Sequence, residues 1–177
     1  MALKTVEAVR TVACLLALLA FSQSTFSAGL AVSQHLEPGS PANFSLPDAD
    51  GTIHALSTHR GGWVVVNFWA TWCGPCVREM PALQNFAHHN DSVTMIGVNF
   101  EEISKLELAA ALNELNIDYV NVQVGDKPLV PFEPLVGLPS TFLVAPDGTL
   151  VYRHTGEVTE DALRDALDEA RRRFVSR

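Results

Sequence analysis

Basic residues are scarce in this sequence, and several common signatures of function are missing from it. Its 177 residues include 12 Lys or Arg against 20 Asp or Glu, which gives a formal net charge of −8. This charge argues against a nucleic-acid partner, since proteins that bind nucleic acid carry a basic patch. We find no internal repeat, no low-complexity run, no glycine-rich phosphate loop and no paired-carboxylate pattern of a hydrolase. The length and the ordinary apolar content predict one globular domain with a sizeable core.

Cysteine is also rare, and the chain contains only three cysteines. Cys73 and Cys76 form a Cys-x-x-Cys pair, and Cys14 lies in an apolar N-terminal segment. A zinc site would need two further ligands, and no histidine pair with ligand spacing follows the motif. A structural disulfide is a second alternative, but an inert bridge is rare at a strand-to-helix turn flanked by tryptophans. Redox chemistry is therefore the favoured interpretation of the pair.

The chain is organised around the stretch that holds this pair. Val64 to Trp69 is a continuous apolar run, which predicts a strand buried on both faces. Apolar residues then recur every three or four positions and predict a helix that starts at the cysteines. Unpaired N–H groups and the helix dipole at such an N-terminus favour a thiolate and lower the pKa of its thiol. The apolar helix positions are Val77, Met80, Leu83 and Ala87.

The two-residue spacing suits thiol–disulfide exchange. One thiol can attack a disulfide in a partner, and the other can resolve the mixed disulfide. Cys73 is nearer the start of the helix, so we assign the attack to Cys73 and the resolving step to Cys76. Pro75 is tolerated between them because the first turn of a helix does not use its N–H group.

The segment Phe68–Cys76, FWATWCGPC, resembles the active site of the thioredoxin superfamily. With Asn67 before it and Glu79-Met-Pro81 after it, the segment resembles the TlpA/ResA-like branch of exported thiol-disulfide oxidoreductases, from about Pro38 to the C-terminus. The resemblance implies a redox-active Cys73–Cys76 disulfide with no further cofactor. It also implies protein disulfides of the cell envelope as substrates, apocytochrome c among them, and a membrane thiol electron donor. The Gly-Pro dipeptide resembles that of reducing thioredoxins, which favours a reductase over an oxidase.

A carboxylate is expected to tune the pair. Thioredoxins themselves carry a buried aspartate at the place of Asn67, which is thought to move protons for the second cysteine, but Asn67 cannot titrate. Glu79 follows Cys76 by three residues and lies about one turn away on the same helix face. The resemblance implies a glutamate there that tunes the cysteines. The alternative is a solvated helix carboxylate beside Arg78.

A second part of the site is expected at Gly137–Phe142. This segment resembles the thioredoxin-fold loop whose proline, here Pro139, is cis and faces the cysteines, and cis bonds are a feature of X-Pro pairs. Such a turn would leave the Leu138 backbone free to pair with an extended substrate segment. We expect an apolar docking surface there. The residues expected to contact the substrate are Trp69, Trp72, Gly74, Pro75, Leu138 and Pro139.

Residues 1–28 resemble a signal sequence. A weakly basic start precedes an unbroken apolar run from Val12 to Phe21, which small and polar residues follow. The run is shorter than the roughly 18 residues of a spanning helix, so cleavage is favoured over an uncleaved anchor. We expect a linker at 29–41 and a monomeric, thioredoxin-like domain at 42–177, located in the periplasm and held at the membrane if the signal is not cleaved.

The pattern along that domain predicts an α/β fold. Phe44–Leu46 and Ile53–Leu56 predict a short hairpin around a turn. A capping box at Ser104 and alternation over Tyr119–Val124 predict a helix and a strand that a minimal thioredoxin lacks. Prolines in 127–137 argue against a long helix where the family has one. We expect a thioredoxin-like mixed central sheet with helices on both faces, an N-terminal hairpin and a central helix–strand insertion.

Two other classes of function stay open. Cys73 and Cys76 could be soft copper ligands in a metallochaperone-type protein, but the motif offers no clear third ligand. A peroxiredoxin-like peroxidase would carry a threonine two or three positions before a lone attacking cysteine. Thr71 is near that place, but the second cysteine fits disulfide exchange better.

Overall fold

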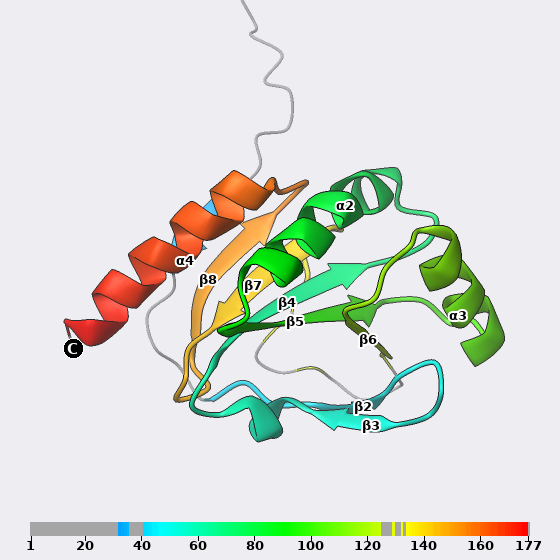
Figure 1. The fold of residues 1–177 in the computed structure, drawn as a ribbon, viewed down its shortest axis with the longest axis horizontal. Helices are drawn as coiled ribbons and strands as arrows, with labels where there is room; N and C mark the ends of the chain where they lie inside the picture. The colour runs from blue at the N-terminus through cyan, green and yellow to red at the C-terminus, as the bar shows by residue number, and fades with distance from the viewer. Residues whose placement is uncertain (1–31, 36–40, 125–128, 130–131, 133, 177) are drawn as a thin grey trace, which may run out of the picture. The chain divides into compact units, whose positions relative to one another are not determined.

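The computed structural model describes residues 32–35, 41–124, 129, 132 and 134–176, so the expected signal sequence lies outside the described residues. A six-stranded mixed sheet has the order β1-β8-β7-β4-β5-β6, and β2 and β3 form a two-stranded sheet (Figure 1). The strands are β1 Val32–His35, β2 Ser45–Pro47, β3 Ile53–Ala55, β4 Trp63–Trp69, β5 Val93–Asn99, β6 Val120–Gln123, β7 Ser140–Val144 and β8 Leu150–Thr155. The helices are η1 Leu56–His59, α2 Gly74–His89, α3 Lys105–Glu114 and α4 Glu160–Val175.

Strand β4 lies in the middle of the sheet and pairs along both edges. It is parallel to β5, with Val65 opposite Met95, and antiparallel to β7, with Val65 opposite Leu143. Six of its seven residues are buried, as the apolar run predicted. Within the range 29–41, which the sequence assigned to a linker, Val32–His35 forms β1 and pairs antiparallel with β8. Its sequence, Val-Ser-Gln-His, has no apolar run that could have predicted a strand.

One face of the sheet carries the α-helices. Val65 belongs to a buried cluster with Leu83 from α2 and Leu167 from α4. Alternate residues of a strand share a face, so Trp69 lies on the same side as Val65, and Trp69 is clustered with Leu108 from α3. Figure 1 shows α2 and α4 side by side over this face.

The other face is covered without an α-helix in the described part of the chain. Phe68 is clustered there with Phe44 beside β2, Leu56 in η1, and the loop residues Leu129 and Phe132. The expected mixed central sheet flanked by helices is confirmed, and so is the N-terminal hairpin β2–β3. Helices on both faces were expected too, and here the structure differs. The hairpin and η1 cover the second face, and the prolines of 127–137 disfavour a helix before β7.

The expected insertion is also present. Helix α3 begins at a capping box, in which Ser104 accepts a hydrogen bond from the backbone of Glu107 and the Glu107 carboxylate accepts one from the backbone of Ser104. Strand β6 then pairs in parallel with β5. Across the described ranges, no helix combines the length and the apolar content that crossing a membrane requires.

Candidate active site

The two cysteines lie in the turn between β4 and α2. Strand β4 ends at Trp69, α2 begins at Gly74, and Cys73 is the N-cap residue of the helix. Cys73 and Cys76 form a disulfide, and Sγ of Cys73 accepts a hydrogen bond from the backbone N–H of Cys76 at 3.3 Å. This N–H group and the helix dipole would stabilise the negative charge of a thiolate at Cys73. Cys73 is 5% exposed and Cys76 is fully buried, so Cys73 is the more accessible of the two.

Glu79 lies on the buried face of α2 and is 1% exposed. Its Oε1 accepts a hydrogen bond from Nδ2 of Asn67 at 2.7 Å, and its Oε2 accepts one from the backbone N–H of Val158 at 2.8 Å. Burial raises the pKa of Glu79 to about 7, and the two hydrogen bonds oppose that rise in part. The alternative of a solvated carboxylate beside Arg78 is therefore wrong.

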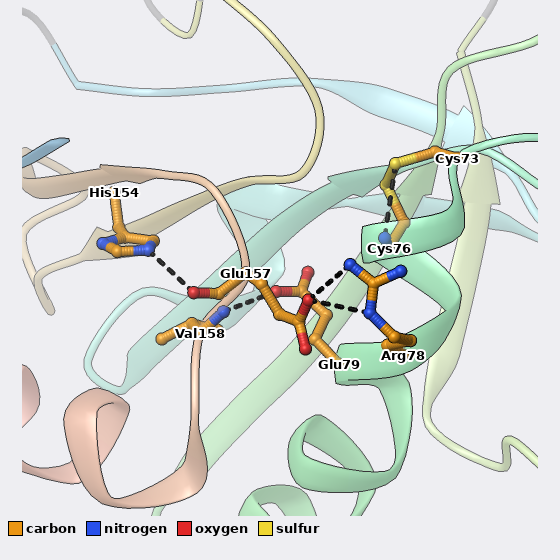
Figure 2. A network of polar contacts seen from close by, with 7 residues as sticks. All are labelled: Cys73, Cys76, Arg78, Glu79, His154, Glu157 and Val158. Atoms are coloured by element: carbon orange, nitrogen blue, oxygen red, sulfur yellow. Dashed lines mark hydrogen bonds and ion pairs between the residues drawn. A yellow bond between two sulfur atoms is a disulfide. The ribbon is translucent and has the colours of Figure 1, made fainter. Parts of the chain in front are cut away.

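Arg78 has a different partner. Its Nε and Nη2 donate hydrogen bonds to Oε2 of Glu157 at 3.1 and 2.9 Å. Nε2 of His154 donates to the carbonyl oxygen of Glu157 at 3.2 Å. Figure 2 shows that residues 157 and 158 contact two successive residues of the redox helix, Arg78 through a side chain and Glu79 through the backbone. The segment before α4 therefore holds the start of α2 in place.

Trp69 does not belong to a docking surface, contrary to the expectation from the sequence. It is fully buried, and its Nε1 donates a hydrogen bond to Oδ1 of Asn121 in β6 at 2.9 Å. Gly97 in β5 allows this approach, because a Cβ at that position would overlap Oδ1 of Asn121 and lie 3.2 Å from Nε1 of Trp69. Because side chains alternate along β4, Trp69 points to the face of the sheet that carries the helices. It packs there in the same buried cluster as Cys73 and Cys76.

Trp72 is the exposed tryptophan of the site, with 69% of its surface accessible. It lines one side of a hollow of about 410 Å³, a size within the range of small-molecule sites. Leu138 lines the hollow too and packs against the cluster that contains both cysteines, so the hollow adjoins the disulfide. The lining residues are Trp72, Phe100, Leu135, Val136, Gly137 and Leu138.

The remaining residues expected at the site surround the same place. The Leu138–Pro139 peptide bond is cis, as the resemblance implied. Pro139 is buried, and its carbonyl accepts a hydrogen bond from the N–H of Gly156 at 2.9 Å. Gly74 and Pro75 are exposed at the start of α2. Their contact with a substrate stays a prediction.

Two residues near the cysteines carry no sequence signal that we recognised. Asn121 holds Trp69, and Glu101 accepts two hydrogen bonds from Thr71, one from the backbone and one from the hydroxyl. Asn121 is the second residue of β6, and Glu101 follows β5, the strand between β4 and β6. Glu101 comes after the carboxyl end of a parallel strand, where the site residues of such sheets gather, and this position was the available signal. Asn121 lies inside β6 and gave no such signal.

The site offers few metal ligands. Among the described residues, no group of three or more His, Cys, Asp or Glu side chains could hold a metal ion. The two cysteines would therefore have to find a further ligand of another type to form a copper site.

Comparisons with known proteins show the family of this chain. A family model described as the AhpC/TSA family matches residues 38–153. The thiol-disulfide oxidoreductase ResA of Bacillus subtilis (strain 168) is 31% identical over 163 residues, which cover 90% of this chain and 90% of that protein. ResA of Geobacillus thermodenitrificans (strain NG80-2) is 30% identical over 162 residues, which cover 90% of this chain and 92% of that protein.

Solved structures share the fold. A DsbF homologue from Corynebacterium diphtheriae superposes with a TM-score of 0.71 at 20% identity, over 84% of this chain and 98% of that chain. StoA from Bacillus subtilis gives a TM-score of 0.61 at 23% identity, over 71% of this chain and 96% of that chain. At these identities the two structures show a common thioredoxin-like architecture.

Proposed function

This chain belongs to the AhpC/TSA family, and we propose that it works as a reductase of disulfides in exported proteins. Its relatives are named thiol-disulfide oxidoreductases, and the Cys73–Cys76 pair supplies the reactive group, so the protein is a protein-disulfide oxidoreductase. The observation that carries the proposal is the position of this disulfide, at a helix N-terminus beside an exposed apolar hollow. An apolar wall beside a reactive sulfur favours a protein segment over a small polar disulfide as the substrate.

The reaction starts from the reduced protein. The Cys73 thiolate attacks one sulfur of the substrate disulfide, so a bond forms between Cys73 and the substrate while the substrate disulfide breaks. The released substrate sulfur leaves as a thiolate and takes up a proton. Cys76 then loses its proton and attacks Sγ of Cys73, which forms the Cys73–Cys76 disulfide and releases the second substrate thiolate. Two electrons have passed to the substrate, and a thiol donor must return them before the next cycle.

We assign Glu79 as the group that accepts the proton of Cys76. Deprotonation of Cys76 is required in the resolving step, and Cys76 is fully buried, so water has little access to it. A general base acts best when its pKa is near the working pH, and burial places the pKa of Glu79 at about 7. Glu79 lies one helical turn after Cys76 on the buried face of α2. We therefore propose that Glu79 accepts this proton, which would be the way in which it tunes the cysteines.

The cellular setting is part of the proposal and rests on the sequence. The signal-like residues 1–28 support export to the periplasm, where disulfides persist. A lone dithiol in an oxidising compartment needs a reductant, and we propose a membrane thiol donor. The Gly-Pro dipeptide between the cysteines supports the reducing direction. Substrates would be envelope proteins, with apocytochrome c as one candidate, and the protein would act as a monomer.

A peroxidase is less well supported by the site. The hydroxyl of Thr71 donates a hydrogen bond to Oε2 of Glu101 at 3.1 Å, and this bond occupies the group that a peroxidase would direct toward its cysteine. Cys73 is also already paired with Cys76. Both observations favour disulfide exchange.

A stoichiometric assay tests the proposed function. The reduced protein, freed of its reductant, is mixed with insulin, and new thiols on insulin are counted by alkylation and mass spectrometry. We expect two thiols on insulin for each Cys73–Cys76 disulfide formed, and none from the Cys73→Ser variant. If the reduced wild-type protein transfers no electrons to insulin or to any folded or unfolded protein disulfide offered, the reductase proposal is wrong.

A further inference from the structure

The carboxylate of Glu101 binds the loop between β4 and α2. Oε1 of Glu101 accepts a hydrogen bond from the backbone N–H of Thr71 at 2.8 Å, and Oε2 accepts one from Oγ1 of Thr71 at 3.1 Å. Both oxygens therefore bind the same loop residue. Hydrogen bonds to an ionised acceptor are stronger than those between neutral groups. Thr71 lies two residues before Cys73, so this contact fixes the chain as it enters the redox site.

The carboxylate is itself supported by neighbouring strands. Nδ2 of Asn99, the last residue of β5, donates a hydrogen bond to Oε1 of Glu101 at 2.8 Å. Nε2 of Gln123, the last residue of β6, donates to the carbonyl oxygens of Glu101 and Ile103. The inserted strand β6 thus holds the backbone of Glu101, while β5 orients its carboxylate. Side chains fixed in this way hold a site more precisely than a free loop can.

Two aromatic residues of the hollow flank this contact in the sequence. Trp72 follows Thr71, and Phe100 precedes Glu101. Phe100 is anchored, because its N–H donates to the carbonyl of Trp69 at 2.8 Å and its ring packs edge-on against Phe68. Trp72 is 69% exposed, and among the described residues it makes no such backbone hydrogen bond or ring contact. The bond between Thr71 and Glu101 therefore sets where Trp72 stands relative to Phe100 at the wall of the hollow.

We propose that Glu101 is a positioning residue that holds Trp72 beside Phe100 and so selects protein disulfides over small disulfides. The inference rests on the proposed function, in which the hollow receives a segment of the substrate protein. A protein segment must contact Trp72 to present its disulfide to Cys73. A small disulfide can reach Cys73 without that contact. Loss of Glu101 should therefore slow the first reaction and leave the second nearly unchanged.

The test compares two substrates of the same reduced enzyme. Rate constants are measured for the reduction of insulin and of 5,5′-dithiobis(2-nitrobenzoate) by the wild type, Glu101→Gln and Thr71→Val. Glu102→Gln is the matched control, since it removes the same charge one residue away and its side chain has no hydrogen bond or ion pair with described residues. We expect Glu101→Gln to slow insulin reduction about tenfold, the effect of one lost charged hydrogen bond. Thr71→Val should slow it less, because the backbone contact remains.

A double variant shows whether Glu101 acts through Trp72. Trp72→Ala should slow insulin reduction, and Glu101→Gln combined with Trp72→Ala should be no slower than Trp72→Ala alone. If Trp72→Ala leaves insulin reduction unchanged, the hollow does not receive the substrate and the proposed docking is wrong. If Trp72→Ala slows it but Glu101→Gln does not, the inference about Glu101 alone is overturned. Equal slowing of both substrates by Glu101→Gln also overturns it, because Glu101 would then act on Cys73 itself.

Discussion

Nδ2 of Asn67 donates a 2.7 Å hydrogen bond to Oε1 of Glu79, between the central strand and the redox helix. Both residues are buried, and Nδ2 of Asn67 also donates to Oγ1 of Thr141 at 3.0 Å. Asparagine has no titrating group, so Glu79 is the proton-binding member of this pair. Desolvation outweighs the two hydrogen bonds that the carboxylate accepts, and its pKa is therefore about 7.

This buried carboxyl makes the stability of the oxidised protein depend on pH. The pKa of Glu79 is about 7 in the folded protein and 4.5 in the unfolded chain, so between these values only the folded state binds the proton. The free energy of unfolding then falls as pH rises through this window, by about 3 kcal/mol from this group. Below pH 4.5 and above pH 7 Glu79 adds no slope.

Glu79→Gln removes this contribution. We expect Glu79→Gln to become more stable relative to the wild type as pH rises from 4 to 8, as measured by the free energy of unfolding in urea. Glu102→Gln, an exposed replacement, should follow the wild type throughout. If the unfolding free energies of the wild type and Glu79→Gln differ by the same amount across this pH window, Glu79 ionises normally and the prediction is wrong.

The same carboxyl should appear in the reactivity of the thiols. We expect the rate of alkylation of Cys73 in the reduced protein to depend on pH through two groups, the thiols and a carboxyl that titrates near 7. Glu79→Gln should leave a profile with the carboxyl step missing. Iodoacetamide labelling from pH 5 to 9, followed by mass spectrometry, measures both profiles. Superimposable profiles would remove Glu79 from the mechanism.

The roles of the two cysteines can be separated by trapping. We expect Cys76→Ser to accumulate a mixed disulfide between Cys73 and a protein substrate, because the resolving thiol is missing. Cys73→Ser should accumulate none, since Cys76 is fully buried and out of reach of a partner. Non-reducing electrophoresis with purified variants detects the complex. A stable complex on Cys73→Ser would reverse the two assignments.

Breaking the hydrogen bond between Trp69 and Asn121 should lower the stability of the protein. In Gly97→Ala the new Cβ would overlap Oδ1 of Asn121, so the side chain must move and leave Nε1 of Trp69 unsatisfied in the core. We expect a loss of about 3 kcal/mol in unfolding free energy, from overpacking and a buried unpaired donor. The control is Gly62→Ala, whose Cβ would meet only the carbonyl of His59 at 3.6 Å. A wild-type melting temperature for Gly97→Ala would contradict this account.

Local patterns explain what the sequence could predict. The apolar run before Cys73, the capping box at Ser104 and the hairpin around residues 48–51 each depend on neighbours a few positions apart, and all three are present in the structure. Trp69 was placed wrongly for a related reason. In a strand buried on both faces, the apolar run hides the alternation that shows which way Trp69 points.

Contacts between strands explain what the sequence could not predict. Glu101 meets Thr71, and Asn121 meets Trp69, only because β4, β5 and β6 lie in one register. Strand β1 is recognised by its backbone pairing with β8, and its polar sequence gives no periodic signal. Such contacts join residues 30 positions apart, as for Thr71 and Glu101, to 123 positions apart, as for Val32 and Thr155, and no spacing rule within one segment reaches that far.

The reduction potential of the Cys73–Cys76 couple tests the central claim most directly. The purified protein is equilibrated with dithiothreitol or glutathione buffers, and the reduced fraction is measured by alkylation. The account predicts a potential near the thioredoxin end of the known range, about −270 mV, which suits a reductase. A value near the oxidising end, about −120 mV, would contradict the reductase and indicate a protein that forms disulfides.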